Sequence, residues 1–209
     1  MLDYVVLDIE TTGLSPVANE IIEIGAWKIS QGVTVCKFSQ LIRPKGFFGR
    51  DVQQITGITL DMLSDAPEIE EVLPVFTDFC GDLPLLGHNL PFDYDFICNK
   101  ARPLGYDFSL NKQRKGIDTL TLCRNYYKGV SHKLQDMADK LGIHLKADNL
   151  QFHRAEYDAY VTKLLYDRFL IIASETNELL RNDIEIPKIL DATDSKYGRA
   201  INSGTLNFG

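Results

Sequence analysis

The alternation of apolar and polar positions near the N-terminus predicts strands. Residues 4–7 form a short, wholly apolar run, which is typical of a strand buried on both faces. Residues 20–30 and 33–43 instead alternate and are rich in β-branched side chains, and Gln31-Gly32 between them favours a hairpin turn. We therefore expect three consecutive strands at the start of the chain.

Helical periodicity dominates the rest of the sequence. It predicts helices at about 68–80, 92–102, 119–127, 133–141 and 154–173, and the apolar runs 84–87 and 116–118 between them predict two more strands. Three leading strands followed by alternating helices and strands predict an α/β fold, with a mixed five-stranded sheet flanked by helices on both faces. Because periodicity fades near residue 174, we expect one domain over 1–173 and a C-terminal extension over 174–209.

The composition is that of a globular protein. Hydrophobic residues make up 44% of the chain and charged residues 24%, which excludes disordered and collagen-like chains. No apolar run approaches the ~20 residues that span a bilayer, and no basic region precedes an apolar stretch as in a signal peptide. The four cysteines lack zinc-site spacing and have apolar or aromatic neighbours, which indicates buried thiols in a reducing compartment. We expect a cytoplasmic protein.

The net charge of −7 disfavours a nucleic-acid partner at first sight, but its distribution is uneven. Residues 51–99 contain ten acidic side chains and no Lys or Arg, whereas residues 100–133 contain eight Lys or Arg and two acidic side chains. Such polarity is compatible with a basic approach beside an acidic pocket. Two solvated faces of different charge would give the same pattern, so charge alone leaves both interpretations open.

Two carboxylates close the first predicted strand. Asp8 and Glu10 are two residues apart, so their side chains point to the same face of the strand. Ligand sites in open α/β sheets lie at strand ends, where adjacent acids repel each other unless a cation neutralises them. Taken alone, this pattern is also common in solvated turns.

Two further clusters each combine an acid with a histidine. After His88, Pro91 favours the start of a helix, so Asp93 lies in its first turn, where it either caps the helix or faces a ligand. Asp158 lies near the start of the last long helix, and His153 precedes that helix, a position where caps and surface residues are common. Only the combination of the three clusters points to a functional site.

The three clusters, in this order, resemble the DEDDh family of 3′→5′ exonucleases, which has a ribonuclease H-like fold. The matching residues are Asp8 and Glu10 in Asp-Ile-Glu-Thr-Thr-Gly, Asp93 in His-Asn-Leu-Pro-Phe-Asp, and His153 with Asp158 in His-x-x-x-x-Asp. The resemblance covers about residues 3–170 and looks closest to the proofreading (epsilon-type) exonuclease subunit or domain of bacterial replicative DNA polymerases. The sister class carries Tyr-x-x-x-Asp in the third motif, and position 154 here is arginine, so the histidine class fits better.

The resemblance implies a metal-dependent exonuclease that hydrolyses single-stranded DNA from its 3′ end and releases nucleoside 5′-monophosphates. Two Mg²⁺ or Mn²⁺ ions would suit its oxygen-rich ligands. By the resemblance, Asp8, Glu10, Asp93 and Asp158 hold the ions. His153, neutral near pH 7, takes a proton from the attacking water. The substrate-binding residues that it implies are Thr11, Thr12, Gly13, Leu14, Ile58, which would wedge against the terminal base, and Asn89.

Two alternatives stay open at this point. An RNA 3′-end-processing exoribonuclease would use the same five residues, because discrimination of the 2′-hydroxyl depends on the shape of the pocket. A non-catalytic polymerase-associated subunit would be expected to lack at least one acid or the histidine, and all five are present. The expected partner is single-stranded nucleic acid with a free 3′ end. A DNA polymerase and a second copy of the chain, forming a homodimer, are open options, and no membrane is expected.

Overall fold

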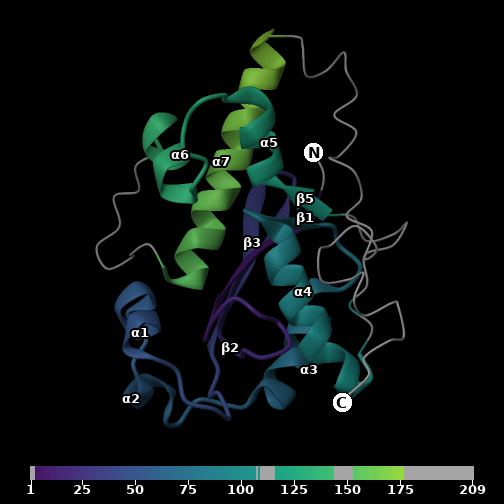
Figure 1. Ribbon diagram of the computed structural model, residues 1–209. Coiled ribbons are helices and arrows are strands. Elements are labelled where there is room, and N and C mark those ends of the chain that lie inside the picture. Colours follow the sequence, from purple (N-terminus) through teal and green to yellow (C-terminus); the bar gives the residue numbers. More distant parts are fainter. Residues whose placement is uncertain (1–2, 107, 109–115, 144–152, 177–209) are drawn as a thin grey trace, which may run out of the picture.

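The computed structural model describes residues 3–106, 108, 116–143 and 153–176 (Figure 1). Its strands are β1 (Tyr4–Thr11), β2 (Ile21–Ser30), β3 (Val33–Leu41), β4 (Leu85–Gly87) and β5 (Gly116–Asp118). The first three pair antiparallel, whereas β4 and β5 add in parallel at the other edge of β1, which gives the order β3-β2-β1-β4-β5. The predicted mixed five-stranded sheet is confirmed.

Helices connect and cover the sheet. They are α1 (Arg50–Thr56), α2 (Leu60–Leu63), α3 (Ile69–Cys80), α4 (Leu90–Ala101), the 3-10 helix η1 (Arg102–Leu104), α5 (Thr119–Tyr126), α6 (Leu134–Lys140) and α7 (Ala155–Thr176). The predicted helices correspond to α3 through α7. Helices α1 and α2, of seven and four residues, were not predicted. Each buries a single residue, Thr56 in α1 and Leu63 in α2, so neither carries an apolar stripe that helical periodicity could reveal.

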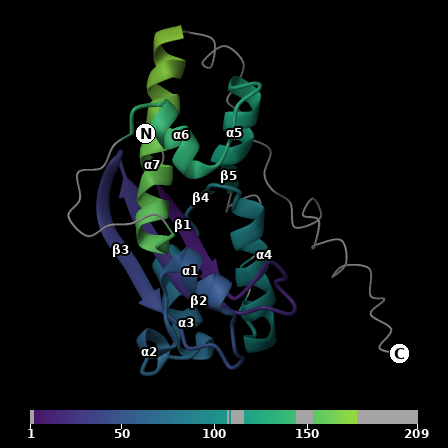
Figure 2. The same ribbon diagram turned by 60° about the vertical axis from the view of Figure 1, so that its left-hand side comes forward.

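Strand β1 separates two apolar layers. Val5, Leu7 and Ile9 point to the face that packs against α3 and α4, whereas Tyr4 and Val6 point to the opposite face and pack against α5, α6 and α7, because side chains alternate along a strand. Figures 1 and 2 show α7 running along the sheet, with α5 and α6 on either side of it in Figure 1. The β1 strand is therefore covered on both faces, as its apolar run predicts.

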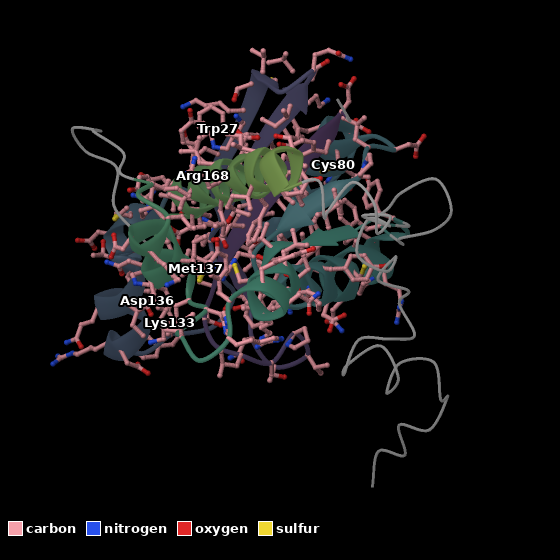
Figure 3. The ribbon with its side chains drawn as sticks, turned by 90° about the horizontal axis from the view of Figure 1, so that it is seen from above. Trp27, Cys80, Lys133, Asp136, Met137 and Arg168 are labelled. Carbon is pink, nitrogen blue, oxygen red and sulfur yellow. The ribbon has the colours of Figure 1, made fainter. Side chains whose placement is uncertain are left out.

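Helix α7 packs directly on Gly25 of β2. A Cβ built on this glycine would lie 2.0 Å from the backbone nitrogen of Glu156 and 2.2 Å from the carbonyl carbon of Ala155. Trp27, two residues along the same face, donates its Nε1–H to the carbonyl oxygen of Glu156 at 2.9 Å. Figure 3, which views the molecule from above, shows Trp27 beside the green helix α7. The absence of a side chain at Gly25 thus allows the first turn of α7 to lie directly on β2.

The hairpin turn agrees with the sequence-based expectation, whereas the burial of the cysteines agrees only in part. Gln31 and Gly32 have φ angles of 53° and 82°, which suit a type I′ hairpin turn, as expected. Cys80 and Cys123 are buried, but Cys36 is exposed, because it lies on β3 at the edge of the sheet. None of the described helices could cross a membrane, since each is too short or too polar.

The expected domain boundary falls inside α7, which continues to Thr176. Residues 177–209 lie outside the described residues. A separate C-terminal extension therefore stays a prediction.

Replacing Gly25 by alanine should destabilise the fold by about 3 kcal/mol, because the clash is with helix backbone, which cannot swing aside. Gly57→Ala is the matched control, since a Cβ there meets nothing within 4 Å and only its φ of 69° is unfavourable, at a cost of about 1–2 kcal/mol. Urea unfolding of both variants measures the difference. Equal losses for the two would contradict the close approach of α7 to β2.

Candidate active site

Strand β1 carries the first two site residues, Asp8 and Glu10, near its C-terminal end. Asp8 lies opposite Gly25 of β2, and Glu10 lies opposite Glu23. Directly opposed residues of an antiparallel pair share a face, so all four positions belong to the face that α7 covers. Asp8 and Glu10 are both half-buried. The predicted carboxylate pair at the end of the strand is thus present, with the start of α7 directly above it.

Helix α4 brings Asp93 to the same strand end. Its Oδ1 accepts a hydrogen bond from the backbone nitrogen of Ile9 at 3.0 Å, and only 3% of the residue is exposed. Ile9 lies between Asp8 and Glu10, so this bond ties the third carboxylate to the first two. Asp93 therefore connects its helix to the strand, which simple capping of α4 would not do.

The start of α4 is itself capped by an acid from β5. Oδ1 of Asp118 accepts hydrogen bonds from the backbone nitrogens of Asn89 and Leu90, at 2.8 and 3.3 Å. The same carboxylate accepts bonds from Leu120 and Thr121 at the start of α5, both at 3.2 Å. One buried acid thus stabilises the starts of two helices. This role of Asp118 was not predicted, although its position between a strand and a helix is typical of a cap.

Helix α7 supplies the remaining acid and the histidine. The backbone nitrogen of His153 donates to Oδ2 of Asp158 at 3.1 Å. His153 has a φ of 67°, a left-handed conformation that is uncommon in residues other than glycine. Potential ligand atoms of Glu10, His153 and Asp158 all lie within 4.8 Å of one another. The five predicted catalytic residues therefore converge at one end of β1.

The carboxyl groups of this cluster are poorly solvated and repel one another. Burial, and then Asp93 and Asp158, raise the pKa of Asp8 well above its ordinary value. Burial followed by the charges of Asp158 and Glu23 raises the pKa of Glu10 to about 9, and burial raises that of Asp158 to about 7. The pKa of Asp93 is raised too, mainly by burial. Such groups ionise together only when a cation compensates their charge.

A divalent cation fits this donor set. Oδ1 of Asp158 is buried and accepts no hydrogen bond from any residue in the described part of the chain. A buried carboxylate oxygen without a partner is costly, and a metal ion would satisfy it. Carboxylate oxygens are hard donors, which Mg²⁺ and Mn²⁺ prefer.

The predicted substrate-binding residues differ in their accessibility. Leu14 is 78% exposed and Asn89 is exposed, so a substrate could touch both. The hydroxyl groups of the two threonines are engaged in the turn after β1. Thr11 donates to the carbonyl oxygen of Gly13 at 2.6 Å, and Thr12 accepts from the backbone nitrogen of Glu20 at 2.9 Å.

Ile58 is fully buried. Its side chain is 0% exposed and packs with Ile22, Phe48 and Leu63 beneath α1 and α2. Ile58 therefore offers no exposed surface to a terminal base in this structure, and its expected role as a wedge stays a prediction. The motif around Ile58 carried no information about its burial, because the residues that cover it belong to other segments of the chain.

Known proteins are similar to this chain in sequence. The profile of the RNase_T exonuclease family matches residues 5–166. The chain belongs to this exonuclease family. The PolC-type DNA polymerase III of Thermotoga maritima is 38% identical over 191 residues, which cover 91% of this chain and 13% of the polymerase. That of Staphylococcus epidermidis RP62A is 39% identical over 199 residues, with coverages of 94% and 13%. The exonuclease chain thus spans about 13% of the length of these relatives.

Solved structures confirm the ribonuclease H-like fold. Exonuclease X in complex with 5′-overhanging duplex DNA has a TM-score of 0.63 and 26% identity, and the match covers 85% of this chain and 93% of that chain. Escherichia coli exonuclease I in complex with a dT13 oligonucleotide has a TM-score of 0.72 and 18% identity, with coverages of 87% and 43%. The predicted resemblance is confirmed, and nuclease chemistry that uses divalent metal ions is general in this family.

Without metal, the exonuclease chain should lose stability as the pH rises from about 4 to about 9. The folded-state pKa values of Glu10 and Asp158, about 9 and about 7, exceed those of unfolded carboxyls, which titrate near 4. The folded state therefore binds more protons over this interval, and raising the pH favours unfolding. Asp8→Asn removes one charge from the cluster, so the loss should be smaller and the melting temperature in chelator higher.

Thermal unfolding in chelator at about pH 5, 7 and 9 measures this effect. Asp82→Asn, which removes an exposed acid in the turn after α3, is the control and should follow the wild type. Identical pH dependence for the wild type and Asp8→Asn would show that the four carboxyls do not interact.

Proposed function

We propose that this chain is a metal-dependent 3′→5′ exonuclease of the DEDDh type that releases nucleoside 5′-monophosphates from single-stranded DNA. The observation that carries the proposal is the convergence of four carboxylates and a histidine at one end of β1. Membership of the exonuclease family supports hydrolysis of phosphodiester bonds. The proposed site comprises Asp8, Glu10, Asp93, His153 and Asp158.

The four acids would hold two Mg²⁺ or Mn²⁺ ions. When bound, such a pair activates water and neutralises the charge that develops on the phosphate and the leaving oxygen. The chain contributes the positions of its ligands. Asp93 is oriented by the Ile9 N–H, and Asp158 is oriented by the His153 N–H. Ligands held in this way before the substrate arrives keep the reacting groups aligned.

His153 is the proposed general base. Its side chain is exposed, and a ring nitrogen lies within 4.8 Å of carboxylate oxygens of Glu10 and Asp158. A neutral imidazole in this place can accept the proton of the attacking water. The same proximity would allow the ring to bind metal, so its role has to be separated from that of the acids by experiment.

The curated relatives favour DNA over RNA as the substrate. Both are PolC-type DNA polymerases III, and exonuclease X and exonuclease I were solved with DNA or an oligonucleotide. The proposal includes proofreading, in which the chain removes nucleotides from the 3′ end that a DNA polymerase extends. No feature of the described residues favours a homodimer, which stays a prediction.

A 5′-labelled single-stranded DNA incubated with Mg²⁺ should yield a ladder that shortens from its 3′ end, and chelator should abolish it. A matched RNA oligomer tested in parallel should be degraded more slowly. Thin-layer chromatography of the digest of a uniformly labelled strand should identify the product as nucleoside 5′-monophosphate. Internal cleavage, or digestion that persists in chelator, would contradict the proposal, and faster digestion of RNA would favour an exoribonuclease instead.

His153→Ala should reduce turnover by about 10²–10⁴-fold, the usual contribution of a general base, while binding of Mn²⁺ should change little. Asp158→Ala should lose both turnover and Mn²⁺ binding, because it removes a metal ligand. Electron paramagnetic resonance titration with Mn²⁺ and single-turnover kinetics measure the two effects separately. Equal weakening of Mn²⁺ binding by both variants would assign His153 to the metal ligands.

A further inference from the structure

We propose that Glu23 and Arg154 form a positioning clamp that determines where the His153 ring lies relative to the catalytic acids. The clamp is the ion pair between these two side chains together with the bond from Glu23 to the backbone of Ala155. The inference deepens the exonuclease function proposed above and rests on it. Neither residue touches the reacting atoms in this view, so both are positioning residues.

The carboxylate of Glu23 accepts hydrogen bonds from residues at the start of α7. Only 1% of it is exposed, and it lies opposite Glu10 across the β1–β2 pair. Its two oxygens accept bonds from Nε of Arg154 at 3.1 and 3.2 Å, and Oε1 accepts a third from Nη2 at 2.7 Å. Oε2 also accepts the backbone N–H of Ala155 at 3.0 Å. This forked geometry defines both the distance and the direction of the arginine side chain.

His153 lies directly beside the clamp in an unfavourable backbone conformation. Its φ of 67° is left-handed, and a residue other than glycine keeps such a conformation only where its surroundings impose it. Asp158 holds the backbone nitrogen of His153, and Glu23 holds the side chain of Arg154 and the nitrogen of Ala155. The two carboxylates therefore constrain the turn that presents the imidazole.

Contacts other than the clamp hold the first turn of α7 against the sheet. Trp27 donates to the carbonyl oxygen of Glu156 at 2.9 Å, Lys37 pairs with the carboxylate of Glu156 at 2.8 Å, and Gly25 gives the helix its close approach. These contacts fasten the first turn of α7 to β2 and β3. What the Glu23–Arg154 pair adds is the placement of the two residues just before that turn, Arg154 itself and His153, the proposed base.

A double-mutant cycle with His153 tests the proposal. Arg154→Ala should lower kcat by about 10–100-fold, the usual effect of losing a supporting residue, with KM within about 3-fold of the wild type. In the His153→Ala background the same change should cost less than about 2-fold, because the group that it positions is already gone. Arg154→Lys should recover only part of kcat, since an ammonium group carries the charge without the fork.

Histidine ring resonances give a readout that is independent of turnover. The chain has four histidines, and loss of one signal in His153→Ala assigns that ring. Arg154→Ala should shift the His153 signal and leave the affinity for Mn²⁺ within about 3-fold. Lys37→Ala is the matched control, because it breaks the other ion pair to the first turn of α7 without touching the turn at His153. It should leave kcat and the ring signal unchanged.

Each outcome bears on the clamp directly. If the losses from Arg154→Ala and His153→Ala multiply in full, or if the ring signal stays in place in Arg154→Ala, the clamp is wrong. Glu23→Gln, which keeps an acceptor for the Ala155 N–H, replaces Arg154→Ala in every measurement should the alanine variant not fold. A wild-type chain without nuclease activity would overturn the proposed function, and the ring signal would then decide on the clamp alone.

Discussion

Mutual repulsion among four poorly solvated carboxyl groups is the constraint on which the rest of this structure depends. Asp8 and Glu10 arrive on one strand, and Asp93 and Asp158 are brought to it by two helices on opposite faces of the sheet. Their raised pKa values show that the folded chain resists ionising all of them at once. Apolar layers on both faces of β1 have to offset that unfavourable electrostatic energy.

The two helices that carry these acids begin in the same manner. Asn89 before α4 and His153 before α7 both have left-handed φ angles, of 71° and 67°. Each helix start also receives a buried carboxylate from a strand, Asp118 for α4 and Glu23 for α7. Strand acids outside the proposed catalytic set thus orient helix starts, and these helices carry two of the proposed catalytic acids, Asp93 and Asp158.

The features that could be predicted from the sequence are those encoded by residues close together along the chain. Alternation and periodicity indicate the strands and α3 to α7, and the spacing within short motifs indicates Asp8, Glu10, Asp93, His153 and Asp158 as one constellation. The supporting contacts have no such signal, because Glu23 and Arg154 are 131 residues apart. Burial of Ile58 likewise depends on Ile22 and Phe48, which no local pattern relates to it.

The contacts on β2 also have a consequence for how the chain folds. Residues 21–26 of β2 are all buried, so both faces of this part of the strand are covered. Alternation of apolar and polar residues therefore does little to specify the register in which β2 pairs with β1. A slip of one residue would turn Glu23 and Gly25 to the opposite face of the sheet. There the buried carboxylate would lose Arg154, and a side chain would take the place of the glycine beneath α7. The residues that support the site therefore also select the strand register, so a misregistered chain would be both unstable and inactive.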